Sequence, residues 1–141
     1  MIDKYGNIVL IDFGSASFIS HLDQTDFEGT MLYCPPEYII SGKYFYEEAT
    51  VWSLGVLLFD LVTGDIPFAS EQDIVEFTDD MISDDSISQD CSHLIRLCLR
   101  RDPGRRIKLN NILTHPWFER NSFDGVDPSS SCNVNSYECG W

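Results

Sequence analysis

Residues 8–14 read IVLIDFG, and residues 35–37 read PPE. Four apolar residues in a row, bounded by turn signals, are typical of a buried strand. Residues 1–3 and the polar turn at residues 4–7 predict the strand that pairs with it. We therefore expect one small β-hairpin that carries the Asp-Phe-Gly tripeptide at its end. Residues 12–29 show no apolar periodicity, and a loop of this length inside a compact domain is usually functional.

The rest of the chain, up to about residue 120, predicts a mostly α-helical domain. Residues 47–62 are apolar on nearly every side, and such a helix is expected to lie buried at the centre of the core. Residues 70–81 place Ile74, Phe77 and Met81 at helical spacing. Further helices are expected at residues 35–40, ending at Gly42, at residues 90–99, capped by Asp90, and at residues 109–118.

The composition of the chain is strongly acidic. Its 141 residues carry 23 acidic against 9 basic side chains, for a net charge of -14, and 43% are hydrophobic. A negative surface repels phosphate backbones and anionic lipid, so we expect neither nucleic-acid nor membrane binding. It attracts basic peptides, although solubility alone also explains such a charge. Residues 121–141 are rich in Ser, Asn, Gly and Asp and predict a mostly disordered tail, which leaves residues 1–120 as the folded domain.

The cysteines do not follow a metal-binding or disulfide pattern. Their number is odd and no two are spaced as C-x-x-C; they are Cys34, Cys91, Cys98, Cys132 and Cys139. Two of them, Cys91 and Cys98, fall in a helical pattern that would bury them. We expect reduced structural thiols, which are typical of an intracellular protein.

Seven short stretches follow one another in the order and spacing of a known domain. Together they resemble the C-terminal lobe of a eukaryotic serine/threonine protein kinase, and within that family the Pim-like subgroup. A lone D-F-G tripeptide is a weak signal, whereas seven ordered stretches are specific. The stretches are residues 10–15 (LIDFGS), 25–30 (TDFEGT), 33–37 (YCPPE), 51–55 (VWSLG), 64–68 (GDIPF), 93–96 (HLIR) and 115–117 (HPW).

The resemblance implies an ATP-dependent protein kinase that uses magnesium. By this likeness Asp12 is a magnesium ligand, and Asp12, Phe13 and Gly14 together form the part of the nucleotide site that this chain contains. Thr30 is expected to lie on the substrate side of the site. The resemblance also implies a cytoplasmic or nuclear protein that phosphorylates other proteins, and we expect it to be a monomer.

Acidic residues occupy two further positions to which the resemblance gives a role. Thr25, Asp26 and Glu28 correspond to the activation segment, where fixed carboxylates partly replace the charge of a phosphate; solvation of a loop is the plain alternative. Asp60 and Asp65 match positions that contact basic residues of the substrate, which implies arginine-rich substrates. The plain alternative for these two is a helix-end cap and a turn aspartate.

The remaining matches are structural, and two positions depart from the common kinase pattern. Glu37 is expected to form a buried bidentate pair with Arg106, which would fix the geometry of the loop. Thr50 holds the place of the usual aspartate in D-x-W-S-x-G, a difference that Pim-like kinases share. Ile107 follows Arg106 where proline is frequent, and we expect little consequence.

Several motifs of the family do not occur in the 141 residues: the glycine-rich loop, the strand lysine and the H-R-D-x-x-x-x-N catalytic loop. Counting back from Asp12, Met1 falls just after the position of that asparagine, so we interpret Met1 as an internal methionine of a longer ancestor. We expect negligible kinase activity from the chain alone. Two alternatives stay open: a non-catalytic module that docks basic peptides or competes with an intact relative, and a fragment without a role of its own.

Overall fold

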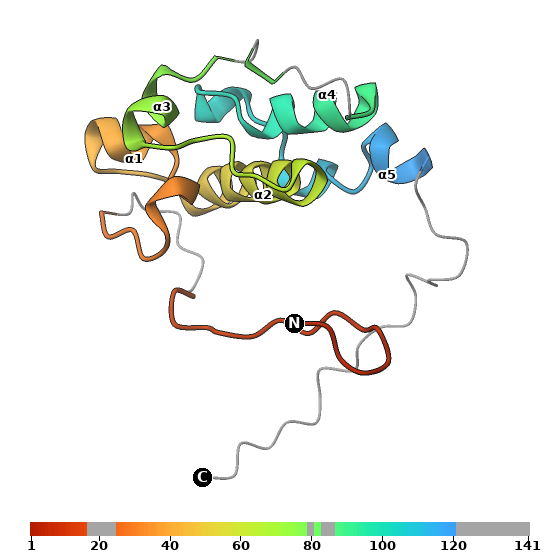
Figure 1. Cartoon of the computed structure of the whole chain (residues 1–141). Helices are drawn as coiled ribbons and strands as arrows, with labels where there is room; N and C mark the ends of the chain where they lie inside the picture. Colours follow the sequence, from red (N-terminus) through yellow and green to blue (C-terminus); the bar gives the residue numbers. More distant parts are fainter. Residues whose placement is uncertain (17–24, 79–80, 83–86, 121–141) are drawn as a thin grey trace, which may run out of the picture.

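The computed structural model describes residues 1–16, 25–78, 81–82 and 87–120. These residues form a mostly helical body, in agreement with the predicted fold class (Figure 1). Its elements are, in chain order, the 3₁₀-helix η1 (Met31–Tyr33), the helices α1 (Pro36–Ser41), α2 (Tyr46–Thr63), α3 (Glu71–Glu76) and α4 (Gln89–Cys98), the 3₁₀-helices η3 (Pro103–Arg105) and η4 (Leu109–Asn111), and α5 (Pro116–Arg120).

The central element is α2, which lies alongside α4, with α1 and α3 at one end and α5 at the other (Figure 1). Trp52 and Val56 on α2 are fully buried in a core shared with Ile95 on α4. Gly55 lets the two helices come close, because a Cβ atom at this position would lie 2.6 Å from the Cβ of Cys98. The long apolar helix predicted from the sequence is therefore the helix on which the others pack.

One face of α2 remains open to solvent among the residues that the structure describes. Leu54, Leu57 and Leu61 are 38%, 40% and 73% exposed, and Val62 beside them is 39% exposed. We call these four residues the α2 apolar stripe. The prediction that α2 is buried on nearly every side is therefore wrong for this stripe, because neighbouring elements cover only the opposite face, which carries Trp52.

The short helix α1 begins and ends where the sequence predicts. Pro36 occupies its first turn, where a missing N–H costs no hydrogen bond. Gly42 ends it in a left-handed conformation with φ 68°, and its N–H donates to the carbonyl of Tyr38. A residue with a Cβ is strained in that conformation, so glycine is the natural stop.

The helices α3 and α4 differ from their predictions at their ends. Because α3 stops at Glu76, Ile74 and Phe77 are buried as expected, but Met81 lies beyond the helix and is 64% exposed. The helix α4 begins at Gln89 and is capped by Ser88, whose hydroxyl accepts a hydrogen bond from the N–H of Cys91. Asp90 therefore lies inside the first turn and is not the cap. A cap side chain accepts from an N–H two or three residues later, and Ser88 stands three residues before Cys91.

The last predicted helix, residues 109–118, is divided in two. η4 covers Leu109–Asn111, and α5 starts only at Pro116. A proline has no N–H to donate and restricts the residue before it, so a continuous helix through His115 and Pro116 is disfavoured. The predicted tail at residues 121–141 lies outside the described residues.

The N-terminal segment runs apart from the helical body (Figure 1). Ile2 and Ile8 form a single antiparallel bridge around the turn at Gly6. Apolar side chains of this segment, such as Ile8 and Leu10, are 87% and 77% exposed. One bridge is less than two paired strands, so the β-hairpin stays a prediction. No helix in the described part of the chain is long and apolar enough to cross a membrane.

Candidate functional site

The Asp12-Phe13-Gly14 tripeptide forms a tight turn at the solvent. Asp12 has φ 62°, a left-handed conformation that is uncommon for a residue other than glycine. Its Oδ1 accepts a hydrogen bond from the N–H of Gly14 at 3.3 Å. The phenyl ring of Phe13 is 65% exposed. The carboxylate therefore sits on a defined turn and presents its other oxygen to the solvent.

Asp12 alone does not make a complete magnesium site. Magnesium requires six oxygen ligands in near-octahedral geometry. Nowhere in the described ranges do three or more His, Cys, Asp or Glu side chains gather closely enough to hold a metal ion. The described residues thus offer one ligand of the family's metal site, and the role of Asp12 in binding magnesium or ATP stays a prediction.

An aromatic cluster anchors the part of the activation segment that precedes η1. The ring of Phe27 packs against Tyr38 and Tyr44, with centroids 5.5 and 5.9 Å away. The hydroxyl of Tyr44 donates to the backbone carbonyl of Asp26 at 2.9 Å. This cluster was not predicted from the sequence, although Phe27, Tyr38 and Tyr44 lie within eighteen positions of one another.

The anchor leaves the predicted activation-segment side chains free to face the solvent. Thr25, Asp26, Glu28 and Thr30 are all exposed. Thr30 precedes η1 as its N-cap residue and makes no side-chain hydrogen bond there. The backbone of this segment is therefore anchored by the aromatic cluster, while its carboxylates and hydroxyls lie on the surface.

Two hydrogen bonds fix η1 on the surface of α2. The hydroxyl of Ser53 donates toward the carbonyl of Tyr33 at 3.0 Å. The hydroxyl of Tyr33 in turn reaches Oδ2 of Asp60 at 3.4 Å, near the other end of α2. Burial, with the neighbouring Asp60 carboxylate as a further cause, raises the pKa of Tyr33, so this hydroxyl stays protonated and acts as a donor. η1 is thus fixed to α2 at two points.

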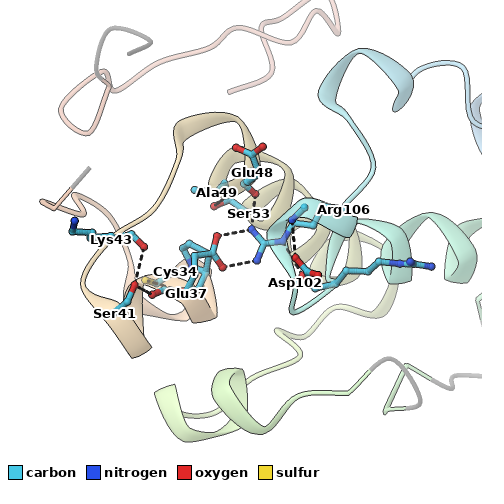
Figure 2. A network of polar contacts seen from close by, with 12 residues as sticks. Cys34, Glu37, Ser41, Lys43, Glu48, Ala49, Ser53, Asp102 and Arg106 are labelled. Carbon is cyan, nitrogen blue, oxygen red and sulfur yellow. Dashed lines mark hydrogen bonds and ion pairs between the residues drawn. The ribbon is translucent and has the colours of Figure 1, made fainter. Parts of the chain in front are cut away.

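The ion pair between Glu37 and Arg106 is the most buried charged contact of the site (Figure 2). Nη1 and Nη2 of Arg106 donate to Oε1 and Oε2 of Glu37 at 2.7 and 2.5 Å. The Arg106 side chain is only 1% exposed. The same guanidinium also donates to the backbone carbonyls of Glu48, at 2.8 Å, and Arg100, at 2.8 Å. One side chain therefore ties together α1, α2 and the turn after α4.

This pair is the bidentate contact that the sequence predicts, and it is now seen directly. The Arg106 guanidinium also stacks over the ring of Trp52, with 5.0 Å between its carbon and the ring centroid. Cys34, next to the PPE turn, is fully buried. Burial, with smaller contributions from Glu37 and Glu71, raises the pKa of this thiol to about 12, so Cys34 is a protonated core residue.

A hollow of about 630 Å³ opens between the activation segment and α2. Asp26 and Glu28 line one side of it, and Leu54 and Leu57 of the α2 apolar stripe line another. Among the described residues that line it there is no Lys, Arg or His. The lining of the hollow therefore combines apolar, hydroxyl-bearing and acidic side chains.

Asp60 and Asp65 lie at the end of α2 and do not line this hollow. Asp60 is half-buried and accepts from Tyr33, whereas Asp65 is exposed and accepts from the N–H of Ile66 at 2.8 Å. The plain alternative of a turn aspartate describes the contact of Asp65, whereas Asp60 is not a helix-end cap, because its carboxylate accepts from the Tyr33 hydroxyl and Gly64 caps α2. A contact of either carboxylate with a cationic partner stays a prediction.

Comparison with known proteins places this arrangement in a family. The family model described as protein kinase domain matches residues 1–118. The serine/threonine-protein kinase pim-2 of Danio rerio is 48% identical over 124 residues, which cover 88% of this chain and 39% of that protein. The serine/threonine-protein kinase prk-2 of Caenorhabditis elegans is 41% identical over 117 residues, which cover 82% and 26%.

A human relative, named SNF-related serine/threonine-protein kinase, is 37% identical over 140 residues, which cover 94% of this chain and 17% of that protein. The chain thus spans well under half the length of each of these relatives. The match covers both the Asp-Phe-Gly turn and the residues that hold the Glu37–Arg106 pair. The chain therefore belongs to the protein kinase family, and its likeness to serine/threonine kinases of the Pim type is confirmed.

Proposed function

We propose that this chain is the substrate-binding part of a Pim-type kinase, which transfers phosphate from ATP·Mg to serine or threonine in arginine-rich proteins. The observation that carries the proposal is the way in which the segment from Asp26 to Glu37 is held. The aromatic cluster, the Ser53–Tyr33 bond and the Glu37–Arg106 pair fix its backbone. A substrate hydroxyl must be positioned closely before transfer, and a rigid loop serves that need.

The charge of the surface supports the proposed substrate class. Asp26 and Glu28 border the hollow, and Asp60 and Asp65 lie at the end of α2. The chain as a whole carries 14 more acidic than basic side chains. Complementary charge of this kind speeds the encounter with a basic peptide and disfavours acidic ones.

We further propose that the chain alone transfers no measurable phosphate. The 141 residues contain neither a glycine-rich loop nor an H-R-D-x-x-x-x-N motif, and these parts supply the phosphate cradle, the base and a second metal ligand in the family. Positioning is worth roughly 7–11 kcal/mol of such a barrier. Because the described residues offer only Asp12 toward the metal, we assign no catalytic step to this chain by itself.

A chimera tests the proposed substrate class. The region of the Danio rerio relative that precedes its matched segment is joined in front of Met1, and transfer to an arginine-rich serine peptide is compared with transfer to a peptide in which glutamine replaces each arginine. We expect the arginine-rich peptide to be strongly preferred. Equal rates for the two peptides would refute the proposed class.

Charge-removing variants of the chimera locate the preference. In Asp60→Asn and Asp65→Asn the side chain keeps an oxygen that accepts from Tyr33 or Ile66, so the local fold is retained. Each change should raise KM for the arginine-rich peptide by about threefold at low salt, and less at high salt. Asp73→Asn on α3, which keeps its contact to the N–H of Ala69, is the matched control and should leave KM unchanged.

The second candidate function is a non-catalytic docking module, and the exposed hollow favours it. Its lining includes Leu54, Leu57, Asp26 and Glu28 but no Lys, Arg or His among the described residues, which suits a basic peptide even without ATP. Fluorescence anisotropy of a labelled arginine-rich peptide with the unmodified chain tests this candidate. Saturable binding that Glu28→Gln weakens would support a docking module, and no binding at low salt would exclude it.

A further inference from the structure

Two histidine rings join α4 to the start of α5. Nδ1 of His93 lies 2.9 Å from Nε2 of His115, and the two rings stack with centroids 5.1 Å apart. His93 is exposed on α4, whereas His115 is 6% exposed. A distance of 2.9 Å between two ring nitrogens is a hydrogen bond, so one nitrogen must carry a proton and the other must not.

A backbone contact decides which nitrogen carries the proton. The N–H of Trp117 donates to Nδ1 of His115 at 3.2 Å, so that nitrogen is bare. A neutral His115 then carries its proton on Nε2 and donates it to His93. His93 must therefore keep Nδ1 bare and carry its own proton on the opposite nitrogen. Both rings have to be neutral for the two contacts, Trp117 to His115 and His115 to His93, to exist together.

A proton on either ring breaks this series of hydrogen bonds. A protonated His93 donates its Nδ1–H to Nε2 of His115, which then carries its own proton on Nδ1. A protonated His115 also carries a proton on Nδ1. In either case the Nδ1–H of His115 faces the N–H of Trp117, so the start of α5 must move away from the His115 ring or the ring must turn.

The surroundings of the pair hold few charges that could offset this effect. Among the described residues, the groups that act electrostatically on His115 are His93 and Asp90, both on α4. On α5 itself, Glu119 carries a carboxylate, and its N–H lies 3.4 Å from the carbonyl of His115. The neighbouring cluster that α2 and α4 form with Trp117 and Phe118 is apolar; its buried members are Val51, Leu94 and Cys98.

We propose that His93 and His115 form a pH-sensitive clasp that holds the start of α5 in place when both rings are neutral and loosens it when either ring takes up a proton. Nothing in the proposed kinase function requires this pair, so the clasp is independent of that function. Loosening acts on Trp117 and Phe118, which are half-buried against the apolar cluster of α2 and α4.

The direction of the pH effect follows from the environment of His115. Burial, and after it the neighbouring His93, lowers the pKa of His115 from its ordinary value of 6.5. The folded form thus prefers the neutral ring. The contribution of the clasp to stability is complete above the unfolded-state pKa of about 6.5 and is lost as the pH falls below it toward the folded-state pKa. The clasp should therefore be closed at neutral pH and weakened at about pH 5.

Amide hydrogen exchange of the full chain, followed by NMR, tests the clasp. The N–H of Phe118 bonds to the carbonyl of His115 at 2.9 Å and reports on the start of α5. We expect its protection factor, corrected for intrinsic exchange, to fall about tenfold between about pH 7.5 and about pH 5, as expected for the loss of one hydrogen bond. Unchanged protection over this range would overturn the proposal.

The variant His93→Asn separates the clasp from general acid destabilisation. Asparagine keeps an oxygen acceptor for Nε2–H of His115 but does not titrate, and His93 is exposed, so the fold should be retained and circular dichroism would verify it. In this variant the pH dependence of the protection factor should differ from that of the wild type, because only His115 can take up a proton and the charge of His93, which lowers the pKa of His115, is removed. His21→Asn, which changes the third histidine of the chain, should behave like the wild type. A pH profile in His93→Asn identical to that of the wild type would also overturn the proposal.

Discussion

At the scale of single residues, Arg106 is the side chain on which most contacts of the site depend. It donates two hydrogen bonds to Glu37, one to the carbonyl of Glu48 and one to that of Arg100, and it covers the ring of Trp52. A guanidinium satisfies all of these partners because its five donors lie in one plane. Its removal leaves the partly buried carboxylate of Glu37 without its bidentate partner and takes one donor from each of two carbonyls.

We predict that Arg106→Met lowers the free energy of unfolding by about 3–5 kcal/mol, the cost of leaving one member of a buried ion pair behind. Urea unfolding followed by circular dichroism measures this change. The matched control is Arg105→Met, because the ion pair of Arg105 with Asp102 is 75% and 60% exposed and contributes under about 1 kcal/mol. Similar losses in the two variants would contradict the role given to Arg106.

The buried thiols give a second prediction at this scale. Burial raises the pKa of Cys34 and of Cys98 to about 12, in Cys98 despite the opposing charge of Arg106. Only the thiolate reacts with disulfide reagents, and almost none is present at about pH 8. We expect Cys34 and Cys98 to resist a dithionitrobenzoate reagent in the folded chain and to react after unfolding in urea, as peptide mapping would detect. Rapid modification of either residue in the folded chain would contradict their burial.

Contacts between residues were predictable from the sequence where a family motif fixes both partners. Glu37 and Arg106 stand 69 positions apart, and only the likeness to a known domain joined them. No motif pairs Tyr33 with Asp60 or His93 with His115, although three of these residues lie in the stretches quoted above. They arise from the way in which η1, α4 and α5 pack, and packing is not visible in local sequence patterns.

At the scale of elements, the contact between α2 and α4 depends on Gly55. An alanine in the middle of a helix is ordinarily favoured over glycine by roughly 0.5–1 kcal/mol. Here the added Cβ would lie 2.6 Å from the Cβ of Cys98 and 2.9 Å from Cδ2 of Leu99. The close approach of the two helices therefore reverses the usual sign.

We predict that Gly55→Ala destabilises the chain by about 1–3 kcal/mol, the usual cost of overpacking a tight core. Thermal unfolding would measure it. Thr50→Ala, at an exposed position of the same helix, is the control and should be neutral or slightly stabilising, because alanine has the higher helix propensity. A Gly55→Ala variant more stable than the wild type would show that α2 and α4 do not pack as described.

The positions of helices were predictable, whereas several of their ends were not. Proline and glycine signals located α1, and the apolar residues of α2 and α4 located these helices, because burial of apolar side chains dominates helix formation. The cap of α4 is Ser88 and not Asp90, since a cap is chosen by which side chain reaches a free N–H. The proline at residue 116 was visible in the sequence, and its effect on residues 109–118 follows from the missing N–H.

At the scale of the whole molecule, the α2 apolar stripe and the acidic hollow set what the chain can do. Burial of α2 was overestimated from the sequence because apolar composition does not reveal which face is covered. Exposed leucines beside a hollow are typical of binding surfaces, and acidic side chains in the lining favour a positively charged partner. We therefore predict a surface that binds basic segments and a chain that needs additional parts for chemistry.

The most direct test of this account is a single-turnover measurement of γ-phosphate transfer to one arginine-rich serine peptide. The unmodified chain is compared with the chimera that supplies the region in front of Met1, and with the same chimera carrying Asp12→Asn. We predict transfer by the chimera, a loss of at least about 10²-fold on Asp12→Asn, and no transfer above background by the unmodified chain. Transfer by the unmodified chain at a rate similar to that of the chimera would contradict the central claim.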